Sequence, residues 1–417
     1  MHAPYPHRPF PAVLALVAVL APMGCGTRAA PPADRVAPGP TPSPVSSAPV
    51  TSAPTAPVTS ASPSTRPLRV PLPSSGSWRR LAPPPVPAGN YQAAWTGTEM
   101  LVHQPNERTH RGSFDAAYKP ATGTWRRLPS SPYPVMWGEG GSQIVWDGTE
   151  LLTFGVMNAA LNPATGRWRP LTAPPLPAAS VVLWTGTAVL IWGGGCCGDA
   201  RAAGAAYDPA TYRWTALPRS PLAGRRARGV WTGTEMVIVG GQTADGVALA
   251  DAAAYNPATR SWRMLPPLPA PRYAATLTWT GREVLVVGGK RRAESVPYAD
   301  GYAYHPGTNR WRRLPAMESG RARHTAVWTG RHLIVWGGQA GRATENPAAP
   351  PHGLVLDPAT GRWAALPTAP LRARTGAAGV WTGTDLLIWG GIGLRDPYPQ
   401  FVDGARYRPS AGALRSH

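Results

Sequence analysis

The sequence feature that most constrains the fold is a set of motifs that recurs seven times. Each unit opens with a tryptophan followed by Thr-Gly or Asp-Gly, and in most units a Gly-Gly pair follows nine residues later. A Tyr-x-Pro or Leu-x-Pro comes next, and in six units a second tryptophan stands seven residues after that Tyr or Leu. The opening tryptophans are Trp95, Trp146, Trp184, Trp231, Trp279, Trp328 and Trp381. Spacings of 38 to 53 residues indicate a repeat protein, in which each unit buries its apolar face against its neighbours.

Each unit is predicted to form four short antiparallel strands, called a, b, c and d in chain order. Strand a ends at the Trp-Thr-Gly, a tight hairpin whose glycine takes a positive φ. Strand b is aliphatic, as in MVIVGG and HLIVWGG, which favours burial on both faces. Strand d carries the second tryptophan with arginine and proline, which suit an outer edge because they discourage pairing with other chains. The predicted fold class is all-β.

These motifs resemble kelch repeats from Ser77 to about Ala413. The resemblance implies a β-propeller, and seven units imply seven blades. The chain begins its repeats with an unpaired strand d around Trp78 and ends them with an unpaired strand c at Tyr407-Arg-Pro409. Joining the two would complete a blade from both chain ends. We therefore predict a seven-bladed kelch-type β-propeller over residues 77–417, closed by its N- and C-terminal strands.

The residues before the repeats predict export. Arg8 and the apolar run Ala12–Ala21 are typical of a signal peptide over residues 1–24, and the run is too short to span a bilayer. Pro22-Met23-Gly24-Cys25 resembles a bacterial lipobox, so Cys25 is the predicted lipid attachment site; an ordinary secretory signal is the alternative. Residues 25–76, rich in Pro, Ser, Thr and Ala, predict a disordered tether. The predicted location is extracytoplasmic, on a bacterial cell membrane, or secreted if Cys25 carries no lipid.

Function is expected where the repeats vary. The interval from Gly-Gly to Tyr/Leu-x-Pro ranges from 6 to 19 residues, so the b–c loop changes most from blade to blade. In kelch propellers this loop shares a face with the d–a loops, around the mouth of the central channel. Blade two has almost no b–c loop, which predicts a notch there. Its long d–a segment carries Trp137 and Glu139, both predicted ligand contacts.

Arginines precede strand a in three consecutive blades. Arg272, Arg321 and Arg374 each stand seven residues before the opening tryptophan. Pointing together at the channel mouth, they would suit a carboxylate or sulfate ligand. The alternative is that they bond backbone carbonyls as structural clips, because residues repeated in such proteins are mostly structural. The equivalent positions of blades one to four are Ala88, Glu139, Pro177 and Gly224, and Arg225, Arg226 and Arg228 lie near Gly224 in blade four.

The resemblance also includes galactose oxidase, whose architecture implies a copper site of two tyrosines, two histidines and a cross-linked cysteine. The histidines here lie in different repeats without a matching motif. We predict no metal and no cofactor; the alternative is a soft-metal site of His103, His110 and His352. Acid/base chemistry would need two loop-face carboxylates a few ångströms apart. The candidates are Glu139, Asp199, Asp251, Asp300 and Asp403.

Cys196 and Cys197 are adjacent in the b–c loop of blade three. Outside the cytoplasm free thiols do not stay reduced, so we predict a vicinal disulfide, with a bridge to another chain as the alternative.

The net charge of +20 indicates an anionic partner. Many arginines follow the strand-d tryptophans and would surround the outer rim, and no nucleic-acid motif is present, so we expect no nucleic-acid partner. We predict a binding module, tethered to the membrane through its lipid, that holds a protein or an anionic envelope polysaccharide on its loop face. We do not expect the protein to be an enzyme. The alternative is a carbohydrate-acting extracytoplasmic enzyme, a galactose oxidase-like oxidase or a sugar isomerase.

Overall fold

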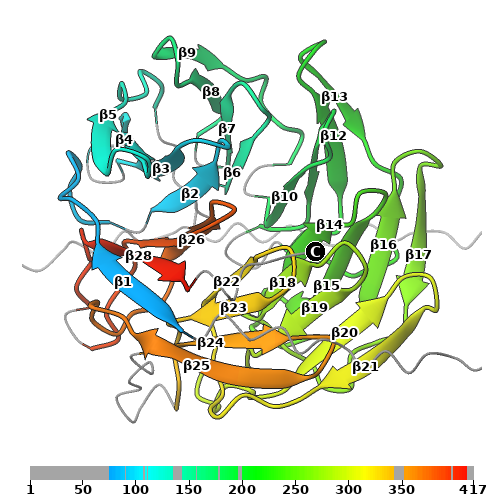
Figure 1. Ribbon diagram of the computed structural model, residues 1–417. Helices are drawn as coiled ribbons and strands as arrows, with labels where there is room; N and C mark the ends of the chain where they lie inside the picture. The colour runs from blue at the N-terminus through cyan, green and yellow to red at the C-terminus, as the bar shows by residue number, and fades with distance from the viewer. Residues whose placement is uncertain are drawn as a thin grey trace, which may run out of the picture. The chain divides into compact units, whose positions relative to one another are not determined.

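A computed structural model describes residues 75–89, 91–106, 109, 111–134, 143–155, 157–176, 179–195, 200–341, 352–395 and 398–410. Its regular structure is entirely β: 28 strands form seven sheets of four strands each. Each sheet is one blade, and the blades follow one another around a ring (Figure 1). No helix long and apolar enough to cross a membrane occurs in the described part of the chain.

The strands of the first four blades are listed in the order a to d. Blade one has β2 (Gln92–Trp95), β3 (Met100–Pro105), β4 (Ser113–Lys119) and β5 (Thr124–Arg127). Blade two has β6 (Gln143–Trp146), β7 (Leu151–Phe154), β8 (Ala159–Asn162) and β9 (Arg167–Pro170). Blade three has β10 (Val181–Trp184), β11 (Val189–Trp192), β12 (Gly204–Asp208) and β13 (Arg213–Ala216). Blade four has β14 (Arg226–Trp231), β15 (Met236–Gln242), β16 (Ala252–Asn256) and β17 (Ser261–Leu265).

The last three blades follow the same order. Blade five has β18 (Thr276–Trp279), β19 (Val284–Val287), β20 (Gly301–His305) and β21 (Arg310–Leu314). Blade six has β22 (Thr325–Trp328), β23 (Leu333–Trp336), β24 (His352–Asp357) and β25 (Arg362–Thr368). Blade seven has β26 (Ala378–Trp381), β27 (Leu386–Trp389), β28 (Gly404–Pro409) and β1 (Gly76–Arg80).

The two ends of the propeller meet in blade seven, as the sequence predicted. β1 pairs antiparallel with β28, with Trp78 opposite Tyr407, and Figure 1 shows the first and last strands side by side. The indole Nε1 of Trp78 donates to the carbonyl of Pro367 in blade six at 2.8 Å. The seven-bladed all-β fold and its closure are confirmed.

The seven strands a form the inner wall of the ring. β2, β6, β10, β14, β18, β22 and β26 contact one another in that order, and β26 contacts β2 again. Each ends in the predicted hairpin, whose glycine has a φ between 89° and 104°. Only glycine adopts this conformation without strain.

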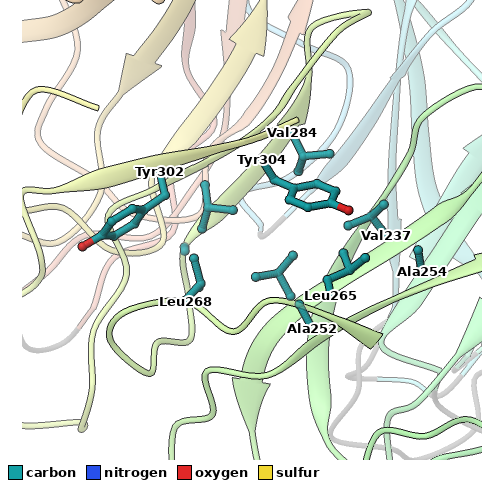
Figure 2. Close-up of a cluster of buried hydrophobic side chains, with 11 residues drawn as sticks. Val237, Ala252, Ala254, Leu265, Leu268, Val284, Tyr302 and Tyr304 are labelled. Atoms are coloured by element: carbon teal, nitrogen blue, oxygen red, sulfur yellow. The ribbon is translucent and has the colours of Figure 1, made fainter. Parts of the chain in front are cut away.

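The core lies between neighbouring blades. Strand b is buried along its length in every blade, because both faces of each sheet are covered. Figure 2 shows one such cluster, in which Val237, Ala252 and Leu265 of blade four pack against Val284 and Tyr304 of blade five.

Each strand-d tryptophan links its blade to the preceding one. Its Nε1 donates to a backbone carbonyl there at 2.7 to 3.0 Å, and all seven blades make this bond. The tryptophans are Trp78, Trp125, Trp168, Trp214, Trp262, Trp311 and Trp363. These rings are half-buried, with an apolar body against the neighbouring blade and an N–H that finds an acceptor there, which explains why tryptophan stands at the same place in every repeat.

Candidate functional site

Four buried arginines join the blades at one end of the channel. Arg225, Arg272, Arg321 and Arg374 are at most 1% exposed. Each guanidinium donates to the carbonyl of the first glycine in the Gly-Gly of its own blade, for example Arg272 to Gly288 at 3.0 Å. The arginine's own carbonyl accepts from the second glycine of the preceding blade, at 2.8 to 2.9 Å. We call each of these arginines, with its two glycine contacts, an arginine clip.

The Gly-Gly pairs exist because of this close approach. A Cβ on Gly240 would lie 2.6 Å from the carbonyl oxygen of Arg272, and one on Gly288 would lie 2.2 Å from that of Arg321. Both glycines also have positive φ. A side chain at either place would therefore collide with the neighbouring clip.

Three of the clips carry a carboxylate. Asp251 pairs with Arg225 at 2.8 Å, Asp300 with Arg272 at 2.8 Å and Asp403 with Arg374 at 2.7 Å. Burial acts to raise the pKa of Asp403, but the guanidinium groups of Arg374 and Arg80 outweigh it and lower that pKa. The described loop-face carboxylates considered above are thus held in ion pairs.

Blade six departs from this pattern. His352 stands directly before the strand-c glycine, where the other clipped blades have aspartate, and its carbonyl accepts from Arg321 at 3.1 Å. Glu318 lies 3.5 Å from Arg321 and 2.5 Å from His352 Nε2. Burial lowers the pKa of Arg321 to about 10, and Glu318 opposes this. Among the four clips, the guanidinium of Arg321 therefore has the most distant carboxylate partner.

The predicted arginines therefore lie together, in consecutive blades, but inside the wall of the propeller. Their contacts are those of the structural clips weighed as the alternative, and direct contact with a ligand stays a prediction. The seven-residue spacing to the opening tryptophan does not identify the fourth clip. Seven residues before Trp231 stands Gly224, whereas the clip arginine is Arg225. The signal that could have found it is Asp251, placed like Asp300 and Asp403 directly before strand c.

The remaining predicted sites lie outside the described residues. These are Cys25, Trp137, Glu139, Cys196, Cys197 and, among the other residues weighed, His110 and Asp199.

Beside the clips a cavity of about 780 Å³ opens at the mouth of the channel. It is lined by the first residues of strands a, with contributions from blades one, two, four, five, six and seven. Strand a begins where strand b ends, as the pairing of Thr276 with Val287 shows, so this mouth lies on the face of the d–a and b–c connections. Among the lining residues that the structure describes are four arginines and no carboxylate.

Two of these arginines are open to solvent. Arg228 and Arg323 are both exposed, and no ion pair or hydrogen bond is formed by either guanidinium with the part of the chain that the structure describes. Desolvation by the surrounding wall lowers the pKa of Arg228, and the charge of Arg323 lowers it further. The mouth therefore holds positive charge that the wall does not neutralise.

Arg323 stands at a position where three blades share a left-handed backbone. Its φ is 53°, and the equivalent Ala274 and Gly376 of blades five and seven have φ values of 55° and 64°. Its N–H donates to the carbonyl of Ala274 at 2.9 Å, and its carbonyl accepts from Gly376 at 3.0 Å. The conformation is strained for a long side chain, but bonds to both neighbouring blades hold it.

Two further basic groups lie behind this surface. Lys290 is buried and donates to the carbonyl of Ala293 at 2.7 Å and to Gln339 at 3.1 Å; burial, then Arg323, lowers its pKa. His324 Nε2 lies 2.8 Å from the hydroxyl of Thr276. Burial lowers the pKa of His324 to about 3, and Arg321 contributes to the shift, so the ring is neutral at pH 7.

His103 lies in the core of blade one. Its Nδ1 is 2.7 Å from Asp115, both side chains are fully buried, and Ser113 donates to the same carboxylate. In blades three and seven the paired positions are a tryptophan and a glycine, as in Trp192 opposite Gly204. The His–Asp pair thus fills the space that one large ring fills elsewhere.

The outer rim is the other basic surface. An arginine on strand d pairs there with the glutamate of the a–b hairpin in blades one, two, four and five, at 2.5 to 2.7 Å. The pairs are Arg126–Glu99, Arg169–Glu150, Arg263–Glu235 and Arg312–Glu283. Much of the rim charge is therefore compensated, unlike that of the mouth.

Comparison with known proteins supports the class defined by this fold. A family model described as the Attractin/LZTR1 beta-propeller matches residues 206–393. A solved structure of a copper-bound fungal alcohol oxidase of the AA5 family aligns with a TM-score of 0.62 at 14% identity, over 82% of this chain and 79% of that one. No curated protein matches. The chain is a seven-bladed β-propeller, and the oxidase shares its fold alone.

The described residues do not fit a copper centre of the kind found in such oxidases. They contain no group of three or more His, Cys, Asp and Glu placed to hold a metal ion. His103 is bonded to Asp115 in the core and His352 to Glu318 at the surface.

Proposed function

We propose that this chain is a binding module that holds an anionic polysaccharide at the mouth of its central channel. The observation that carries the proposal is the cavity of about 780 Å³, into which two exposed arginines contribute charge that no described carboxylate neutralises. A concave site with a few converging polar groups is where a propeller most readily takes a ligand.

Charge supports the mouth over the rim as the binding surface. A rim arginine such as Arg126 already has a bidentate carboxylate partner, Glu99, so an anion would have to displace it. Arg228 and Arg323 need no such exchange. An anionic ligand would relieve the repulsion between the two like charges in the enclosed channel.

A catalytic function has less support. Asp251, Asp300 and Asp403 are bound to buried arginines, which leaves them occupied as structural partners and not placed as an acid/base pair. The proposed function is therefore binding.

The proposed setting is the outside of a bacterial cell, with the propeller carried on a tether from a lipid on Cys25. The sequence features around Cys25 support this, and metabolic palmitate labelling tests it. Label is expected on the full chain and not on Cys25→Ser; label on both, or on neither, would contradict the anchor.

Binding is tested with the purified propeller-containing chain on an array of uronate-bearing, sulfated and neutral glycans, with acidic peptides alongside. We expect retention of the anionic glycans over neutral ones of equal length, with affinity that falls as salt rises because the contact is electrostatic. Equal binding of neutral glycans, or no glycan binding, would overturn the proposed function.

A further inference from the structure

We infer that Arg228 and Arg323 form a specific site for the carboxylate of a sugar acid, at the mouth of the central channel. This inference rests on the proposed binding function and names its charged contacts and its ligand class. The two arginines come from blades four and six, and both line the same cavity.

The first argument is the place of Arg228 in the wall. It stands three residues before the opening tryptophan of its blade, where the other strands a also present a residue to the channel. In blades one, two, five and six these residues are Gln92, Gln143, Thr276 and Thr325, and in blade seven the residue is Ala378. Four polar side chains and one guanidinium at this level of the wall suit a hydroxylated anion better than an apolar one.

The second argument is the backbone at the two arginines. β14 and β15 shift register between Arg226 and Arg228, and such a bulge redirects the side chains beside it. Arg323 has a left-handed φ of 53°, as its equivalents Ala274 (55°) and Gly376 (64°) have, and of these three cavity-lining residues it alone is charged.

The third argument is electrostatic. The pair of guanidinium groups is close enough for Arg323 to act on the pKa of Arg228, and the buried Lys290 adds positive potential behind Arg323. A carboxylate between them would accept from both planar forks, which match its two oxygens. The neutral His324 adds no repulsion and leaves the charge to the arginines.

The other blades supply the test variants. Arg228→Gln introduces the residue that blades one and two carry at that position, and Arg323→Ala introduces that of blade five. Both side chains fit the fold, so loss of binding can be separated from unfolding. Arg282→Gln is the matched control, since Arg282 is an exposed arginine in an a–b hairpin, at the opposite end of strand a.

The probe is an oligosaccharide of four glucuronate units, titrated calorimetrically, with the four-unit glucose oligosaccharide as the uncharged match and hexaglutamate as the acidic peptide. Each of Arg228→Gln and Arg323→Ala is expected to weaken glucuronate binding by about tenfold or more, and Arg282→Gln by less than about twofold. Arg323→Ala should leave the melting temperature nearly unchanged, because alanine already adopts this left-handed φ at Ala274 in blade five.

The outcomes separate this inference from the proposed function. If the glycan array shows anionic binding but neither variant weakens it, the two-arginine site is wrong and the proposed function stands. If hexaglutamate binds through these arginines and glucuronate does not, the sugar-acid class is overturned. If no glycan binds the array and glucuronate does not titrate, both fail.

Discussion

The two halves of the ring are built from the same strands but are joined differently at the channel mouth. In blades four to seven an arginine clip binds each blade to the one before it. In blades one to three the corresponding positions are Ala88, Glu139 and Pro177, and their described residues contain no buried arginine. The tryptophan bond on the outer edge, by contrast, is present in all seven blades.

This difference separates what closes the ring from what shapes its mouth. The tryptophan bonds act on both halves, so they belong to the architecture. The clips act only in the half that contributes Arg228 and Arg323 to the cavity, and their backbone bonds hold Arg225 and Arg321, which shortly precede these two arginines. A binding site works best when a second layer of contacts fixes its side chains, and under the proposed function the clips would supply that layer.

Removal of a clip should have the largest effect. Arg272→Ala removes a guanidinium that is 1% exposed and leaves the carbonyl of Gly288 without its donor, while Asp300, 18% exposed, keeps only the hydroxyl of Tyr302. Loss of one member of a buried ion pair costs about 3–5 kcal/mol, and because Asp300 is partly open to water the free energy of unfolding should fall by about 3 kcal/mol. Equilibrium urea denaturation measures it.

Two controls sharpen this result. Arg282→Ala, which removes an exposed arginine of the same blade, should change stability by less than about 0.5 kcal/mol. Arg272→Met combined with Asp300→Ala removes both charges and should cost less than Arg272→Ala alone, because no unpaired charge stays buried. A loss for Arg272→Ala no larger than that of Arg282→Ala would show that the clips do not hold the blades together.

Acid should weaken the clipped half through His324. Blades five and seven carry Ala275 and Ala377 at this position, so the buried ring is particular to blade six. Its pKa is about 3 in the fold against 6.5 in the unfolded chain. Between these values the unfolded chain binds a proton that the folded one does not, so stability is lost as pH falls below 6.5. The slope is at most about 1.4 kcal/mol per pH unit.

Urea denaturation at pH 7, 6 and 5 tests this, with His324→Ala as the comparison. The variant should start less stable, because a ring is removed from the core. The slope of its unfolding free energy with pH should be smaller by up to about 1.4 kcal/mol per pH unit, which corresponds to one proton. His332, whose pKa burial also lowers, remains in both proteins and accounts for part of the slope they share. Parallel pH profiles would exclude His324 as the source.

The sequence predicts the architecture well because the blade is a local pattern. The hairpin glycines, the buried strands b and the closure by Trp78 and Tyr407 each depend on spacing within one unit, and the structure confirms them. The candidate site is harder, because it depends on which way each arginine side chain points. Arg321 is buried in a clip while Arg323, two residues later, is exposed in the channel, and the sequence does not distinguish the two.

A one-residue shift in blade four explains why the constant spacing does not identify Arg225. Blade four reaches its opening tryptophan one residue sooner after the clip than blades five to seven do, so constant spacing assigns Gly224 in place of Arg225. The pairing of β14 with β15 shifts beside it, between Arg226 and Arg228. Only the contacts with Gly240 and Asp251 show that Arg225 belongs with the other three clips.

The smallest expected effect is a stabilisation, from adding a carboxylate to the clip of blade six. His352→Asp in blade six places a carboxylate where Asp251, Asp300 and Asp403 stand in the other clipped blades, next to the guanidinium of Arg321. The gain from a charge-assisted hydrogen bond is partly offset by loss of the contact between His352 and Glu318, so we expect a net stabilisation of about 1 kcal/mol. His352→Asn is the matched variant, because it has nearly the same shape without the charge. Urea denaturation should place His352→Asp above both the wild type and His352→Asn; if the asparagine variant is equally stable, the carboxylate is not what completes the clip.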